Sequence, residues 1–161
     1  IGGTEFMSAL ELDAKSMGLG KGMRRKKAID RYLDELYIKE ERIHTYRNTG
    51  REVRYNFYTA KYEQAESLSD IVDALAKGNF MDGHYGVSGH TKAYWKDEQH
   101  IFVETFAEIF TVYKSRKAKK WLKDNLPNTL EAFDNIMKGI VDGWRIKPTK
   151  ILWWCIKRIY R

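Results

Sequence analysis

The chain has little cysteine and little proline, with one and two residues respectively among 161. The single Cys155 cannot form an internal disulfide, so a disulfide-stapled scaffold is excluded. No stretch approaches the roughly 18 consecutive apolar residues of a membrane span, and no signal segment opens the chain. A hydrophobic content of 43% is too high for disorder. We therefore expect one soluble domain in a cytoplasmic setting.

Catalytic signatures are missing as well. The sequence contains no Gly-rich phosphate loop, no Ser-His-Asp order, no nucleotide-binding fingerprint and no His-Glu-x-x-His string. It therefore predicts no complete catalytic site.

Positive charge is concentrated at the C-terminal end. The net charge is +7, but residues 144–161 contain six basic residues and no acid, which leaves +1 for residues 1–143. This basic, aromatic tail suits a membrane surface, a phosphate backbone or a hydrophobic partner groove. Packing of the tail onto its own domain or onto a crystal neighbour is the interpretation we favour, because exposed tryptophan pairs are rare on monomers. The residues predicted to bind a partner are Trp153, Trp154, Lys157 and Arg158.

Hydrophobic periodicity predicts a mainly α fold. Residues 1–6 read IGGTEF, which resembles a vector remnant, and we leave them out of the fold prediction. Residues 7–143 form the predicted helical domain and 144–161 the tail. Ser8 and Glu11 have capping-box spacing for a first helix. A second helix is predicted from Met23 onward on an apolar face formed by Ile29, Tyr32, Leu33, Leu36 and Ile43.

The middle of the chain is harder to assign. Residues 51–62 alternate like a strand but also fit a helix, which we favour. Ser67 or Ser69 is predicted to cap the next helix, and Gly78 to end it. Residues 79–92 are rich in Gly and polar side chains and predict an irregular loop of the kind that often carries function.

Two further helices are predicted after this loop. One runs from about His100 to Lys120 and has a basic end. Pro127 then marks a break, and Asn128 and Glu131 have capping-box spacing for the last helix.

Four blocks between residues 69 and 128 follow one another as in a known family. They are Ser69–Leu75 (SDIVDAL), Gly89–Trp95 (GHTKAYW), Glu104–Phe110 (ETFAEIF) and Leu126–Asn128 (LPN). Together, residues 67–142 resemble the C-terminal, zincin-like metallopeptidase part of phage Mu F-like minor head (head-morphogenesis) proteins. The third block is also similar to the third-ligand helix of anthrax lethal factor, a zincin. The resemblance implies a helical domain like the C-terminal half of a zincin-like fold, with a Gly- and His-rich loop before the helix that carries Glu104.

The resemblance also implies site residues. Glu104 occupies the position of the third zinc ligand. In an active relative Tyr94 would donate a hydrogen bond to an oxyanion, and packing beside Trp95 is the alternative. The string nearest to His-Glu-x-x-His is Glu40–His44, on a helix in our prediction, where Glu41 matches the general base and His44 one ligand. Glu40 stands in place of the first histidine. In the phage group the helix that carries His-Glu-x-x-His lies upstream of the matched blocks. The chain is therefore either a fragment cut after that helix or a diverged member without the metal.

The loop histidines form a second candidate site. His84, His90 and His100, with Asp82 nearby, are zinc-ligand types, but their spacing matches no compact zinc finger. Backbone hydrogen bonding within the loop is the alternative. Glu104 and Glu108 share a helical face, which suits acid–base chemistry, a cation site or solvent. Metal candidates are therefore Glu104, His44 and His90, although the missing motif predicts that this chain carries no zinc.

Three functional hypotheses follow. The first is a phage or prophage minor head protein segment that acts as a structural or interaction module, with virion or portal proteins as partners. It would be located in the cytoplasm of the bacterial host or in the virion. The second is a zinc-dependent peptidase or toxin that uses Glu104 as a ligand. The third is a nucleic-acid or anionic-membrane binder that works through residues 144–161.

Overall fold

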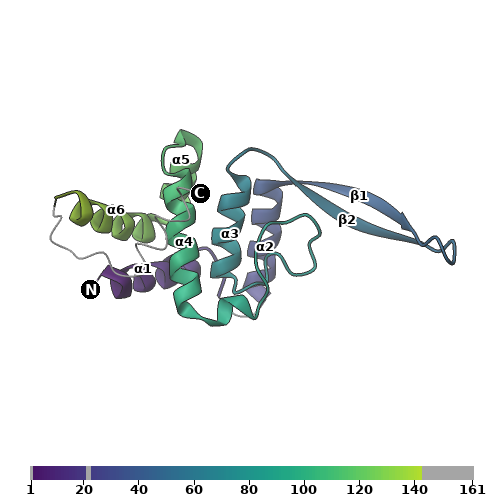
Figure 1. Cartoon of the computed structure of the whole chain (residues 1–161), viewed down its shortest axis with the longest axis horizontal. Helices are drawn as coiled ribbons and strands as arrows, with labels where there is room; N and C mark the ends of the chain where they lie inside the picture. The colour runs from purple at the N-terminus through teal and green to yellow at the C-terminus, as the bar shows by residue number, and fades with distance from the viewer. Residues whose placement is uncertain (1, 21–22, 143–161) are drawn as a thin grey trace.

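A computed structural model describes residues 2–20 and 23–142, and the tail residues Trp153, Trp154, Lys157 and Arg158 lie outside this range. The described part is mostly helical, as predicted, with six α-helices and one antiparallel pair of strands (Figure 1). None of its helices has the length and apolar content needed to cross a membrane. The elements are α1 (Gly2–Ser16), α2 (Met23–Leu36), β1 (Tyr37–Thr45), β2 (Glu52–Ala60), α3 (Ala65–Leu75), a 3-10 turn η1 (Tyr94–Lys96), α4 (Glu98–Val112), α5 (Arg116–Asn125) and α6 (Pro127–Asp142).

The helices pack in pairs around one core. Helix α1 lies beside α6, α3 lies beside α4, and the two strands extend away from the helices along the longest axis of the molecule (Figure 1). Buried side chains from all six helices form a single cluster. The helices therefore supply most of the core, which the base of the hairpin joins through Tyr37 and Tyr58, and the outer part of the hairpin stands outside it.

The opening residues belong to this core. Helix α1 begins at Gly2, and Phe6 is fully buried, with its ring centroid 5.2 Å from that of Phe102 and 5.7 Å from that of Phe106. Our exclusion of residues 1–6 from the fold was therefore wrong, because an aromatic ring at this position completes the packing of α4. We predicted that Ser8 caps the first helix, but Ser8 lies inside α1 and does not cap it.

A buried carboxylate joins the first and last helices. Asp13 of α1 accepts hydrogen bonds from the Thr129 backbone N–H and hydroxyl, both at 2.7 Å, and from the Asn128 side chain, also at 2.7 Å. Asp13 thus satisfies N–H groups in the first turn of α6 that have no partner within the helix. We predicted that Asn128 would cap α6, but the cap comes from another helix.

The second predicted helix is shorter than its periodicity suggested. Its first apolar positions, Ile29, Tyr32, Leu33 and Leu36, are buried as predicted, but α2 ends at Leu36 and the chain continues directly as β1. Ile43 is exposed and lies opposite Arg54 in the strand pair. Glu40–His44 is therefore on a strand, and our placement of it on a helix was wrong.

Residues 52–60 form β2, which corrects our preference for a helix over 51–62. Strand β2 pairs with β1 in an unbroken register from Tyr37 opposite Ala60 to Thr45 opposite Glu52. Its alternating half-buried side chains, Val53, Tyr55 and Phe57, follow the period of two that a strand requires. Local periodicity left the choice between helix and strand open, and cross-strand pairing makes this segment a strand.

The remaining helix boundaries agree with the prediction only in part. Helix α3 begins at Ala65, before both predicted caps, and Ser69 is buried within it. It ends at Leu75, before Gly78, as predicted. The predicted helix 100–120 is two helices, because the Ser115 hydroxyl accepts a hydrogen bond from the Ala118 N–H and starts α5.

Candidate functional site

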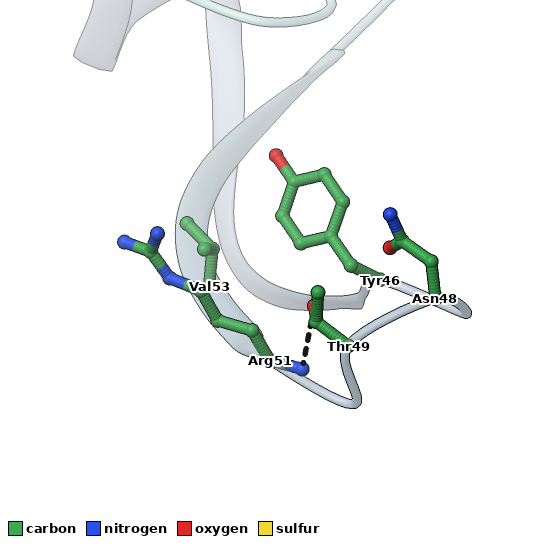
Figure 2. A pocket seen from close by; sticks show the side chains of 5 residues that line it. All are labelled: Tyr46, Asn48, Thr49, Arg51 and Val53. Atoms are coloured by element: carbon green, nitrogen blue, oxygen red, sulfur yellow. Dashed lines mark hydrogen bonds between the residues drawn. The ribbon is translucent and has the colours of Figure 1, made fainter.

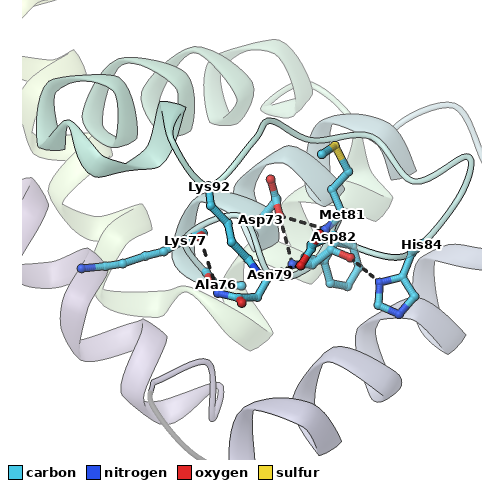
Figure 3. Close-up of polar contacts among 9 residues, drawn as sticks. Asp73, Ala76, Lys77, Asn79, Met81, Asp82, His84 and Lys92 are labelled. Carbon is cyan, nitrogen blue, oxygen red and sulfur yellow. Dashed lines mark hydrogen bonds and ion pairs between the residues drawn. The ribbon is translucent and has the colours of Figure 1, made fainter.

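The irregular loop between α3 and α4 is held by one buried carboxylate. Asp73 of α3 is fully buried, and its Oδ1 accepts hydrogen bonds from the backbone N–H groups of Phe80 (3.0 Å) and Met81 (2.9 Å). Its Oδ2 accepts bonds from the His90 N–H (2.9 Å) and from the Trp95 indole (2.7 Å). Figure 3 shows Asp73 among the loop residues that surround it. Both ends of the loop are therefore fixed to the same side chain.

This arrangement explains one glycine of the loop. A Cβ atom at Gly89 would lie 2.6 Å from Asp73 Oδ2 and 2.9 Å from the Cβ of Met81. Since real Cβ atoms do not approach so closely, only glycine lets the loop backbone reach the carboxylate.

A second buried carboxylate faces the loop from α4. Glu104 is 2% exposed, and its Oε1 accepts a 2.6 Å hydrogen bond from the Tyr94 hydroxyl. The Tyr94 ring is stacked on His90 (centroids 4.3 Å apart) and on His100 (4.2 Å apart). Two rings this close to a third must occupy its opposite faces. The resulting Glu104 cluster, defined as Glu104, Tyr94, His90 and His100, joins the loop to α4.

A third carboxylate borders this cluster. Asp70 of α3 accepts a 2.8 Å hydrogen bond from the Ser88 hydroxyl. The Ser88 backbone N–H donates to the Tyr37 hydroxyl (3.0 Å), and its carbonyl accepts from Ser69 (2.7 Å). Burial raises the pKa of Asp70 above its ordinary value, and the negative charges of Asp73 and Glu104 add to this, while the Ser88 bond and a charged His90 oppose it.

The raised pKa of Asp70 predicts a pH-dependent stability. A carboxyl group whose pKa is higher in the folded state favours folding when protonated, and this contribution is lost as the pH rises from about 3.8 through the folded pKa. An Asp70→Asn variant keeps an acceptor for Ser88 but carries no charge. We therefore expect it to melt at a higher temperature than the wild type at pH 7, with the difference disappearing below pH 3.8. Melting followed by circular dichroism at both pH values tests this, and a variant that is less stable at pH 7 would contradict it.

The remaining candidate residues are dispersed. Glu41 and His44 lie on the exposed strand β1, where Glu41 forms an ion pair with Arg54 (3.3 Å) and His44 packs against Tyr46. Because they project from a strand outside the helical body, they do not join the Glu104 cluster. The structure thus brings together Glu104, Tyr94 and His90, and it separates Glu41 and His44 from them.

The outer part of the loop is held by its own polar contacts. His84 Nδ1 lies 2.7 Å from the Phe80 carbonyl oxygen, and Asp82 forms a 2.5 Å ion pair with Lys92 (Figure 3). His84 and Asp82 therefore take part in loop structure, in line with the alternative that the sequence left open.

The geometry limits what the Glu104 cluster can do. Within residues 2–20 and 23–142, no three His, Cys, Asp or Glu side chains are grouped so that they could hold a metal ion. The three residues named for zinc do not fit a common site, since His44 is on the hairpin. The Tyr94 hydroxyl donates to Glu104, so the phenolic proton is directed at a carboxylate. The pair can hold a proton between two oxygens and connect the loop to α4.

Comparison with known protein families, with curated proteins and with solved structures finds no match. The chain is therefore assigned to no family on this basis.

Asp73 and Asp70 are the residues that sequence reasoning missed. Both lie within the Ser69–Leu75 block that carries the resemblance, but neither was proposed as a site residue. One indication was available: Asp73 follows Ile71 and Val72 and precedes Ala74 and Leu75, so it interrupts an otherwise apolar run. A carboxylate in such a run has to be paired if it is buried.

Proposed function

We propose that this chain is a segment of a phage- or prophage-derived minor head protein, in which a zincin-like half acts as a structural and interaction module. The observation that carries the proposal is the inward position of Glu104, 2% exposed and bonded to Tyr94, beside the loop that bears His90. This is the arrangement that the resemblance implies for the third-ligand helix and the loop before it.

The local contacts favour a structural role over hydrolysis. Glu104 is engaged by the Tyr94 hydroxyl, and Asp73 is saturated by four donors. Glu41 and His44, the residues closest to a catalytic base and a zinc ligand, lie on the exposed hairpin. The buried carboxylates therefore act as cross-links that fix the loop on the helical body.

Partners of such a module are proteins of the particle. A rigid body with a projecting hairpin offers surfaces to portal or other virion components, first in the host cytoplasm during assembly and then in the virion. Purified particles of the phage that carries this gene should contain the chain, as detected by mass spectrometry of tryptic peptides. Peptides found in the infected lysate but absent from purified particles would contradict the proposal.

Zinc binding separates this proposal from the peptidase alternative. We expect the purified chain to hold much less than one zinc per molecule after incubation with zinc and desalting, as measured by elemental analysis. The Glu104→Gln variant keeps an acceptor for Tyr94 and should give the same low value.

One zinc per chain that is lost in Glu104→Gln, together with cleavage of a peptide substrate, would support the peptidase instead. A Glu98→Gln variant is the matched control, since Glu98 is an exposed acid of the same helix.

A further inference from the structure

The hairpin of residues 37–60, here called the arm, is the least covered part of the described chain. It projects beyond the helices (Figure 1), and every residue from Ile38 to Glu52 is exposed. In the described ranges its sheet has only two strands, and the one further backbone bridge is between Phe57 and Tyr85 near its base. In the part of the chain that the structure describes, most of the arm therefore contacts only other residues of the arm.

Arginine is concentrated at the outer half of the arm. Residues 42–54 contain four arginines and one glutamate, with no lysine or aspartate, and carry a net charge of +3. Because residues 1–143 carry +1 in total, the rest of that range carries −2. Over its full length, residues 37–60, the arm carries a net charge of +2, and its outer half holds the excess of positive charge.

The four arginines of the arm are exposed, and contacts with neighbouring side chains hold two of them in place. Arg42 lies over the Phe57 ring (3.7 Å to its centroid) and contacts Glu40, and Arg54 is held by Glu41. Arg47 and Arg51, on either side of the turn, form no ion pair with an acid of residues 2–20 or 23–142. Their guanidinium groups are available to an anionic partner.

The tip is ordered by hydrogen bonds within the turn. The Tyr46 N–H donates to the Arg51 carbonyl (2.9 Å), and the Gly50 N–H donates to the Tyr46 carbonyl (2.8 Å). The Arg51 N–H donates to the Thr49 hydroxyl (3.3 Å; Figure 2), and Gly50 takes a positive φ of 65° that suits glycine. A turn held in this way loses little conformational entropy when it binds a partner.

A shallow hollow of about 480 Å³ lies at this tip. It is lined by Tyr46, Asn48, Thr49, Arg51 and Val53 (Figure 2). Guanidinium, amide and hydroxyl groups are the donors that proteins use on phosphate oxygens and base edges.

We propose that the arm binds double-stranded DNA by placing its two strands in the major groove, with Arg47 and Arg51 on phosphates. A two-stranded β-ribbon matches the width of that groove, roughly 12 Å. Of the aromatic rings of the arm, Phe57 is covered by Arg42, and Tyr55 and Tyr46 have edge-on contacts with Tyr85 (5.4 Å between centroids) and His44 (4.7 Å). Ribbon shape and arginine charge therefore favour a duplex over a single strand.

The test measures binding of the full chain to a labelled 20-base-pair duplex by fluorescence anisotropy between 50 and 200 mM salt (about the range over which phosphate contacts dominate affinity). For the variant Arg47→Gln/Arg51→Gln we expect at least about a tenfold weaker Kd at low salt and a salt slope smaller by about 2. Its melting temperature should be unchanged, since both side chains are exposed.

Two controls remove the same charge elsewhere. Lys114→Gln/Lys123→Gln alters exposed lysines beside and within α5, and Lys157→Gln/Arg158→Gln alters the tail. Each should change Kd less than about twofold, which would support the arm. Equal losses in all three variants, a loss confined to the tail variant, or no duplex binding at low salt would overturn the proposal.

Two competitors distinguish other partners. Tighter binding of the matching single strand would overturn the choice of a duplex. Polyglutamate that binds as tightly as the duplex, and with the same dependence on Arg47 and Arg51, would identify an acidic protein as the partner and would also overturn the proposal.

Discussion

Replacing Asp73 by alanine is expected to lower the free energy of unfolding by about 4 kcal/mol or more, since hydrogen bonds to a charged acceptor contribute roughly 1–3 kcal/mol each. The carboxylate accepts four bonds, and three of them come from backbone N–H groups of the loop. Its removal leaves the Phe80 N–H and the Trp95 indole buried without an acceptor. Urea unfolding followed by circular dichroism measures the loss.

Asparagine at the same position should rescue little. Its carbonyl oxygen can accept from Phe80 and Met81, but its NH2 group then faces the N–H of His90 and the indole of Trp95, which are also donors. We therefore expect Asp73→Asn to be nearly as unstable as Asp73→Ala. Asp82→Ala serves as the control, because Asp82 is an exposed acid of the loop that Asp73 holds, and it should shift the melting temperature little. A loss below about 1 kcal/mol for Asp73→Ala would mean that the loop does not depend on this carboxylate.

The Asp73 contacts also link the loop to the Glu104 cluster. The His90 N–H is bonded to Asp73, and the His90 ring stacks on Tyr94, which donates to Glu104. A change at Asp73 should therefore alter the NMR signals of His90 and Tyr94, although neither side chain is substituted. The fixed loop is what holds Tyr94 in position to reach Glu104.

Sequence patterns predicted those parts of the fold that depend on local periodicity. The apolar faces that contain Leu33, Ile71 and Phe133 are buried on helices. The spacing of Glu104 and Glu108 left their surroundings open, and the structure buries Glu104. A helix pattern repeats within a few residues, so it can be read without knowledge of the partner element.

The predictions failed where contacts between residues distant in sequence determine the structure. Tyr37–Thr45 becomes a strand because residues 52–60 pair with it, and no periodicity within 37–45 indicates that partner. The cap of α6 comes from Asp13, which is more than 100 positions away in sequence. Asp73 resembles a solvent-facing acid by residue type, and only its four donors explain its burial. Tertiary contacts overrode local preference in all three places.

The opening residues provide the second large effect. Phe6→Ala is expected to lower the free energy of unfolding by about 3–5 kcal/mol, the usual cost of removing a buried phenylalanine ring. The Phe6 ring is fully buried and contacts the rings of both Phe102 and Phe106, so its loss leaves a cavity against α4. Urea unfolding of the variant beside the wild type measures the change.

A matched substitution and a truncation test whether the loss of stability in Phe6→Ala comes from the buried ring. Leu12→Ala alters an equally apolar residue of α1 that is 57% exposed, and it should change stability by less than about 0.5 kcal/mol. Removal of residues 1–6 should destabilise the chain at least as much as Phe6→Ala, because it also shortens α1. If the truncated chain is as stable as the wild type, the first turn of α1 is dispensable and the domain begins at Met7. If it is destabilised, residues that resemble a vector remnant complete the hydrophobic core, because burial depends on the space a side chain fills and not on its origin.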